Sequence, residues 1–153
     1  MDQAAFKAGL SRWGSGVSVI TTADNRGVAN GFTATSFASV SLEPPLVLFC
    51  LAIGSQSLAA FQENPTFAVN ILSEDQQELS NRFAQRDGDK FDGLDRLDSA
   101  GSPLLAGCLA NLSCEKRDVI PQGDHIIFVG EVVNVIVGEG KPLLYFQGGY
   151  AQL

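Results

Sequence analysis

The feature that most constrains the fold of this chain is a succession of β-branched, apolar segments separated by short turns. Residues 15–22 alternate as a half-buried strand does, and the turn residues 24–27 predict that 28–33 returns beside it as a hairpin. A Pro-Pro pair precedes an apolar strand over 46–53, which we expect to be buried on both faces. Further strands are predicted over residues 66–72, 107–117, 125–137 and 143–147, with a connection at 118–124 that contains Pro121 and Gly123.

Few helical patterns interrupt this β-rich order. Helices are predicted over residues 2–12, 55–62 and 73–85. Asp2 is placed to cap the first of them, and Ser73 with Gln76 three residues later is a capping-box pattern at the start of the third. The acidic, turn-rich segment 87–101 is predicted to be a loop.

Strands joined mostly by short turns favour a closed antiparallel barrel. A doubly wound parallel sheet would need a helix between nearly all of its strands, and the sequence lacks those helices. It also lacks the G-x-G-x-x-G and G-x-x-x-x-G-K-S/T patterns, so a nucleotide would have to be held by some other architecture. The length of 153 residues suits a single domain, 1–153.

Composition excludes several classes of function. The net charge of -7, from 10 basic and 17 acidic side chains, argues against a nucleic-acid partner. The longest apolar run has 8 residues, and a membrane helix needs about 20. We therefore expect no membrane partner, and the absence of a secretory leader pattern predicts a cytoplasmic protein.

The reactive side chains are few. His125 is the single histidine, and Cys50, Cys108 and Cys114 have no metal-ligand or disulfide spacing, so we predict no metal site. The cysteines are expected to be small apolar residues of a reduced compartment. Redox chemistry in such a chain would need a borrowed cofactor.

Two hydroxyl-rich segments flank the apolar strand 46–53. The segment 33–41, TATSFASVS, can bind an extended polar ligand or can be the polar face of an edge strand. Ser55, Gln56 and Ser57 precede the predicted short helix, where free N–H groups and hydroxyls suit a phosphate, although an ordinary helix cap has the same composition.

Three further positions are ambiguous. His125 can donate a hydrogen bond or a proton to a ligand, or it can be structural. Because neighbours on a strand point to opposite faces, we do not expect Asp124 to orient its ring, which argues against a Ser–His–Asp triad. Lys90 can reach a phosphate or can balance the acidic loop, and Tyr150 lies in a Gly-Gly-Tyr turn that is ordinary at a chain end.

Taken together, these segments closely resemble the short flavin reductase-like family, almost from end to end. The landmarks are GVSVITT (16–22), GFTATSF (31–37), SVSLEPPL (39–46), FAVNIL (67–72), Phe83-Ala84, Lys90-Phe91, GDH (123–125) and GEV (130–132). The resemblance implies an FMN-binding split barrel, a closed antiparallel Greek-key barrel with a few short flanking helices. It also implies a homodimer that reduces FMN or FAD with NADH or NADPH and releases reduced flavin to a separate oxygenase component of a two-component monooxygenase.

The resemblance assigns roles by position. Thr33, Ala34, Thr35 and Ser36 would line the isoalloxazine, and Ser39, Val40 and Ser41 would follow the ribityl chain and phosphate. Ser55, Gln56 and Ser57 would hold the phosphate, while Phe83 and Lys90 would close over the flavin. His125, the expected catalytic residue, would sit on the nicotinamide side, where Tyr150 would help to form the pocket.

The expected chemistry agrees with this composition. Hydride transfer between a nicotinamide and a flavin needs no protein nucleophile and no metal, only two rings held in contact and donors for the reduced flavin. Two alternatives stay open: a non-catalytic flavin-binding electron carrier or sensor, and a barrel that binds an unrelated ligand.

Overall fold

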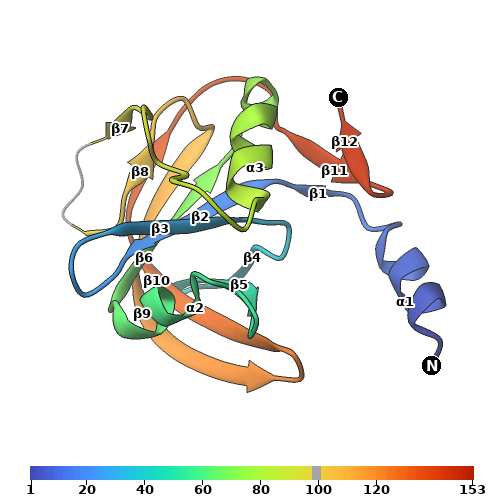
Figure 1. Ribbon diagram of the computed structural model, residues 1–153. Helices are drawn as coiled ribbons and strands as arrows, with labels where there is room; N and C mark the ends of the chain where they lie inside the picture. The colour runs from blue at the N-terminus through green and yellow to red at the C-terminus, as the bar shows by residue number, and fades with distance from the viewer. Residues whose placement is uncertain (98–100) are drawn as a thin grey trace.

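The computed structural model describes residues 1–97 and 101–153, and the fold is mainly β, as predicted (Figure 1). The main sheet of the described residues has the strand order β3-β2-β6-β9-β10-β5-β4, and each neighbouring pair is antiparallel. Its strands are β2 (Ser18–Ala23), β3 (Ala29–Ala34), β4 (Ala38–Leu42), β5 (Pro45–Ala52), β6 (Thr66–Ile71), β9 (Ala110–Gln122) and β10 (His125–Val137).

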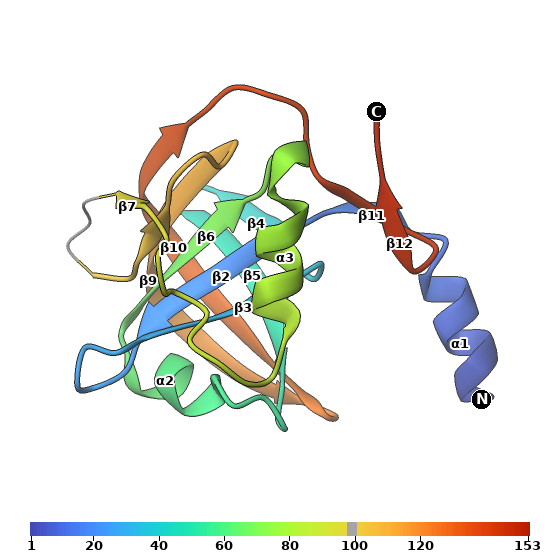
Figure 2. The same cartoon turned by 45° about the horizontal axis from the view of Figure 1, so that its top comes forward.

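Two small sheets lie beside the main one. One has the order β1-β11-β12, and the other pairs β7 with β8. Their strands are β1 (Ser15–Gly16), β11 (Leu144–Phe146), β12 (Gly149–Ala151), β7 (Arg96–Leu97) and β8 (Leu104–Leu105). Both views show the first of these sheets, together with helix α1 (Gln3–Leu10), extending away from the main sheet (Figures 1 and 2).

The predicted helices form, with shifted boundaries. Asp2 caps α1 by accepting hydrogen bonds from the amides of Ala4 and Ala5, as the sequence indicates. The helix expected over 55–62 is α2 (Leu58–Glu63), so 55–57 form the turn before it. The helix expected over 73–85 is a 3₁₀ turn η1 (Glu74–Gln76) followed by α3 (Gln77–Ala84), and the predicted capping box is present.

The prediction that the strand over 46–53 is buried on both faces is wrong. Along β5, Val47, Phe49 and Leu51 are buried and the residues between them are half-buried. The strand lies in an antiparallel sheet between β4 and β10, so one face of β5 packs into the core and the other does not.

The connection predicted at 118–124 is also wrong. β9 continues to Gln122, and only Gly123 and Asp124 separate it from β10. Pro121 pairs with Ile126, whereas the pairing of β9 with β6 ends at Glu115. At Pro121 the opposite side of β9 is therefore an edge, where a residue without an N–H is tolerated.

Other differences are local. The strand expected over 15–22 divides at Val17 into β1 and β2, and β8 and β12 were not predicted. The end of segment 33–41, for which an edge strand was one alternative, belongs to β4 at the edge of the main sheet. The expected loop 87–101 contains β7, and residues 98–100 of that prediction lie outside the described residues.

The core consists of two apolar clusters that support the site. Phe49 stands at the centre of the first, stacked on Phe128 with ring centroids 5.0 Å apart and edge-on to Phe61 and Phe67. The second lies under α3, where Phe83 meets Phe91 edge-on at 4.9 Å. Phe83 of the second cluster also lines the pocket described next.

Candidate functional site

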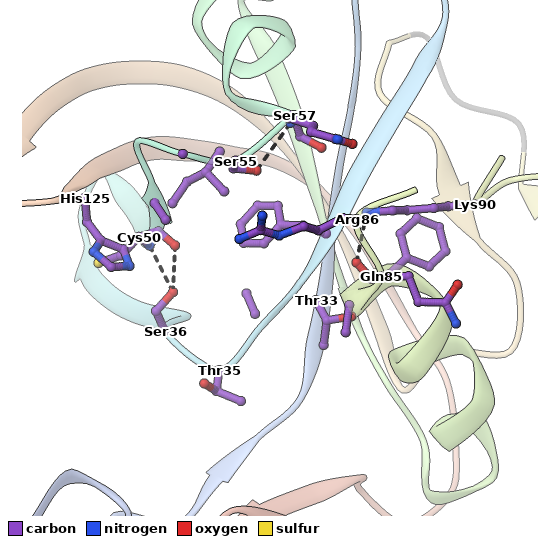
Figure 3. A pocket seen from close by; sticks show the side chains of 18 residues that line it. Thr33, Thr35, Ser36, Cys50, Ser55, Ser57, Gln85, Arg86, Lys90 and His125 are labelled. Atoms are coloured by element: carbon purple, nitrogen blue, oxygen red, sulfur yellow. Dashed lines mark hydrogen bonds between the residues drawn. The ribbon is translucent and has the colours of Figure 1, made fainter. Parts of the chain in front are cut away.

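A pocket of about 610 Å³ opens where β3 and β5 end, beside the turn before α2 and the end of α3 (Figure 3). It brings together many of the residues that the sequence singles out: Thr33, Ala34, Thr35, Ser36, Ser55, Gln56, Ser57, Phe83, Lys90 and His125. These residues come from segments far apart in the chain. The pocket volume falls in the range of roughly 300–1,000 Å³ that small-molecule sites occupy.

The hydroxyls at and just after the end of β3 differ in whether they already make hydrogen bonds within the protein. Thr33 donates to the carbonyl of Ser80 on α3 at 2.6 Å. The hydroxyl of Ser36 donates to the Cys50 carbonyl at 3.1 Å and accepts from the Cys50 amide at 3.0 Å. Thr35 is exposed, and its hydroxyl has no hydrogen bond within the described residues, so it is available to a ligand.

The turn before α2 contributes a second polar wall. Ser55 accepts a hydrogen bond from the Ser57 amide at 3.3 Å, and the buried Ser57 hydroxyl donates to the Gly31 carbonyl at 3.4 Å. Gln56 is exposed and lies 3.5 Å from Asp87 across the pocket rim. The turn is thus bonded to β3 through Gly31.

Two cations face the pocket from the segment after α3. Lys90 donates to the carbonyls of Phe83 at 3.1 Å and Gly31 at 3.3 Å, and partial burial lowers its pKa. Among the described residues neither Lys90 nor Arg86 has a carboxylate partner. The pocket therefore has positive charge to offer an anion.

Sequence reasoning missed Arg86 as a site residue. A signal was present, since Arg86 stands two residues after the landmark Phe83-Ala84 and four residues before Lys90. The other lining residues it missed are Phe32, Cys50, Leu51, Ala52, Gly54, Ala84 and Gln85. Burial raises the pKa of the Cys50 thiol, which keeps that side chain protonated.

His125 lies at the other end of the pocket from Lys90, at the start of β10 (Figure 3). Its side chain is 47% exposed, and its Nδ1 lies 2.7 Å from Oδ1 of Asp124. The hydrogen bond and the charge of His125 lower the pKa of Asp124. The expectation that Asp124 would not orient this ring is wrong, because Asp124 belongs to the hairpin turn and the alternation of strand residues does not apply there.

Four predicted site residues lie outside this pocket. Ser39, Val40 and Ser41 are on β4, where a register shift interrupts the pairing with β5. The Tyr150 hydroxyl donates to Asn81 on α3 at 2.8 Å and lies 2.8 Å from the Ser80 hydroxyl. For these four residues a ligand-binding role stays a prediction.

The described residues contain no group of three or more metal-ligating side chains, and no helix among them is long and apolar enough to cross a membrane. The pocket instead combines an apolar wall, hydroxyls, two cations and one imidazole. Such a site suits an elongated ligand with a flat ring near His125 and an anionic group near Lys90.

The fold and this pocket define a mainly β protein whose pocket suits a ring-bearing anion. Residues 10–153 match the family described as flavin reductase like domain. The reductase subunit HsaB of a flavin-dependent monooxygenase from Rhodococcus jostii is 44% identical over 98% of this chain and 77% of its own length. The FMN reductase (NADH) SmoA of Agrobacterium fabrum is 40% identical over 97% of this chain and 84% of its own.

A solved structure shares the fold of this chain. The NADH:FAD oxidoreductase SgcE6 of Streptomyces globisporus, in complex with NAD and FAD fragments, has a TM-score of 0.93 and 33% identity, covering 99% of this chain and 93% of its own. The chain belongs to the flavin reductase-like family, which confirms the resemblance found in the sequence.

Proposed function

We propose that this chain is an NAD(P)H-dependent flavin reductase that supplies reduced flavin to a partner monooxygenase. The observation that carries the proposal is the pocket with Lys90 at one end, His125 at the other and Arg86 between them (Figure 3), in a chain of this family. The relatives named as a monooxygenase reductase subunit and as an FMN reductase (NADH) support the same reaction.

The donor set fits a flavin. Thr35 and the chain around Ser36 would face the polar edge of the isoalloxazine, and the apolar residues at the end of β5 would face its ring. Ser55, Gln56, Arg86 and Lys90 would hold the phosphate by charge-assisted hydrogen bonds. When bound, the flavin accepts a hydride from the nicotinamide, so the protein need only hold the two rings in contact and exclude water.

His125 is the residue we assign to the nicotinamide side. Its Nδ1 is engaged with Asp124 at 2.7 Å, which directs Nε2 away from that carboxylate. Nε2 can then bond a carboxamide or hold a proton beside the reacting rings. Asp124 is a positioning residue in this arrangement, since it acts through the imidazole.

The test is an assay of NADH and NADPH oxidation, followed by nicotinamide absorbance, with FMN and with FAD. We expect oxidation that depends on added flavin. His125→Ala should raise KM for the nicotinamide several-fold or lower kcat while leaving flavin affinity, measured by fluorescence quenching, unchanged. Binding of flavin without oxidation of either nicotinamide would indicate a non-catalytic flavin carrier or sensor. Absence of flavin binding would indicate a protein that binds an unrelated ligand.

Several finer points belong to the same proposal. We propose a homodimer, because the apolar side chains of α1 are exposed in the single chain, and a separate oxygenase component as the recipient of reduced flavin. The three free cysteines support a cytoplasmic location. Residues 1–153 would form one domain with a closed Greek-key barrel, in which Ser39, Val40, Ser41 and Tyr150 would extend the flavin and nicotinamide sites.

A further inference from the structure

Gly31 connects two walls of the pocket, although it does not line the pocket itself. It lies on β3, which stands at the end of the strand order of the main sheet and so has no neighbouring strand on one side among the described residues. The Gly31 carbonyl accepts hydrogen bonds from the Ser57 hydroxyl at 3.4 Å and from the Lys90 ammonium at 3.3 Å. Both of these side chains line the pocket (Figure 3). One backbone oxygen therefore holds together the turn before α2 and the segment after α3.

The backbone at Gly31 has no room for a side chain. A Cβ at this position would lie 2.9 Å from the carbonyl oxygen of Ile20 and 2.9 Å from Cε1 of Phe83. The Phe83 ring is 1% exposed and packs edge-on against Phe91 at 4.9 Å, so it cannot move aside cheaply. The end of α3 can approach β3 this closely only because residue 31 is a glycine.

This close approach brings two carbonyls within reach of one ammonium. Lys90 donates to the Phe83 carbonyl at 3.1 Å as well as to that of Gly31, and it makes no other hydrogen bond within the described residues. A lysine ammonium has three N–H donors, so one of them is left for a ligand. A free lysine side chain loses rotamer freedom when it binds an anion, whereas the two carbonyls have already restricted this one. The ammonium is thus in place before an anion arrives.

We propose that Gly31 is a positioning residue for Lys90, because its carbonyl and its lack of a side chain hold the ammonium where it meets the flavin phosphate. The inference rests on the proposed function, in which Lys90 binds that phosphate. Gly31 acts through Lys90, since it lines no part of the pocket. A change at Gly31 should therefore alter the discrimination between a flavin that carries a phosphate and one that does not.

The test is Gly31→Ala, with FMN and riboflavin affinity measured by fluorescence quenching and folding checked by circular dichroism. FMN carries the phosphate and riboflavin does not, so the ratio of the two affinities reports the contact with Lys90. We expect the preference for FMN to fall about tenfold, which corresponds to about 1.4 kcal/mol. An unchanged ratio in the folded variant would overturn the proposal.

A double-mutant cycle tests whether the effect passes through Lys90. Lys90→Met removes the ammonium, so adding Gly31→Ala to it should change the ratio of FMN to riboflavin affinity no further. A second tenfold fall in the double variant would mean that Gly31 acts through another group, and the proposal would be wrong.

The matched control is Gly130→Ala, the same substitution at another closely packed glycine. A Cβ there would overlap the Phe67 ring, and neither residue lines the pocket. This variant should lose stability and keep the FMN to riboflavin ratio of the unmodified protein. An equal fall of the ratio in Gly130→Ala would assign the effect to lost stability and not to the position of Lys90.

A further measurement needs no substitution at Gly31. In NMR of the lysine ammonium groups at mildly acidic pH, without flavin, the Lys90 hydrogens should exchange with water several-fold more slowly than those of the exposed Lys7. Exchange as fast as that of Lys7 would show that the carbonyls do not hold the ammonium, which would overturn the proposal. Equal affinity of the unmodified protein for FMN and riboflavin would also overturn it while leaving the reductase function intact. Absence of binding of both flavins would instead defeat the proposed function, and this inference with it.

Discussion

Lys90 is a cation whose ionisation depends on its partial burial beside the pocket. It donates to two backbone carbonyls, and burial lowers its pKa below the range of an ordinary lysine. A flavin phosphate would bind its protonated form, so FMN affinity should fall as pH rises through this lowered pKa. The phosphate itself loses its second proton near pH 6, so above about pH 7 its own charge does not change.

This predicts about a tenfold loss of FMN affinity between neutral and alkaline pH, measured by fluorescence quenching. Riboflavin, which lacks the phosphate, should show no such loss. The control is Lys90→Arg, whose guanidinium stays protonated and should remove the alkaline loss. If Lys90→Arg loses FMN affinity at alkaline pH as the unmodified protein does, the loss does not come from deprotonation of Lys90, and the prediction is wrong.

The three cysteines should differ in reactivity. Burial raises the pKa of Cys108 to about 11 and that of Cys114 to about 12, whereas Cys50 is only half-buried and lines the pocket. Iodoacetamide at neutral pH should therefore modify Cys50 slowly and the other two hardly at all. Saturating FMN should slow the modification of Cys50 several-fold, as followed by peptide mass spectrometry. Protein unfolded in urea is the control, and modification of Cys50 at the same rate with and without FMN would contradict its place in the site.

Strand β10 passes very close to β6 and β9 at Gly130. A Cβ at this position would lie within about an atom's radius of the Phe67 ring, at 2.4 Å from its Cζ, and 3.2 Å from Cβ of Cys114. We predict that Gly130→Ala lowers the free energy of unfolding by about 1–3 kcal/mol, because the packed ring cannot move aside cheaply. The measurement is urea unfolding.

Gly16→Ala is the matched control, since a Cβ on Gly16 meets no atom within 4 Å. It should change the unfolding free energy by less than about 1 kcal/mol. Equal destabilisation by the two substitutions would mean that glycine flexibility, and not close packing, is what matters at Gly130.

Elements with local signals could be predicted from the sequence, and those defined by distant partners could not. The Asp2 cap and the Ser73–Gln76 capping box involve residues within three positions of each other, and both form. Pro121 indicated a break, but whether a proline interrupts a strand depends on which side of that strand is an edge. The Asp124–His125 contact could not be predicted for a similar reason. It depends on the two-residue turn that contains Asp124, and the sequence did not show where that turn lies.

The site could not be assembled from local sequence signals either, because it depends on the arrangement of the whole molecule. Its walls come from segments around residues 33, 55, 86 and 125, which only the strand order β3-β2-β6-β9-β10-β5-β4 brings together. Family resemblance supplied most of these residues in advance. Arg86 was missed because one arginine in a polar segment carries no periodic signal, and the only signal was its position between two landmarks of the family. Its assigned role follows from the pocket that it lines together with Lys90.

The helix α1 carries apolar side chains that the fold of the single chain leaves uncovered. No residue of α1 is buried, and Phe6, Leu10 and the nearby Trp13 are 55%, 58% and 77% exposed. An isolated helix of 8 residues is marginal in water, so it needs a surface on which its apolar side can pack. In the proposed homodimer that surface belongs to a second copy of the chain.

We therefore predict that the protein sediments with twice the 16.2 kDa mass of one chain. Phe6→Lys combined with Leu10→Lys should raise the dimer dissociation constant at least about tenfold, because two charges would be buried at the interface. The control combines Phe6→Leu with Leu10→Met, which keeps the apolar surface and should keep the dimer. Sedimentation at the mass of a single chain would refute the homodimer. A dimer whose dissociation constant is unchanged by the two lysine substitutions would show that α1 is not part of the interface.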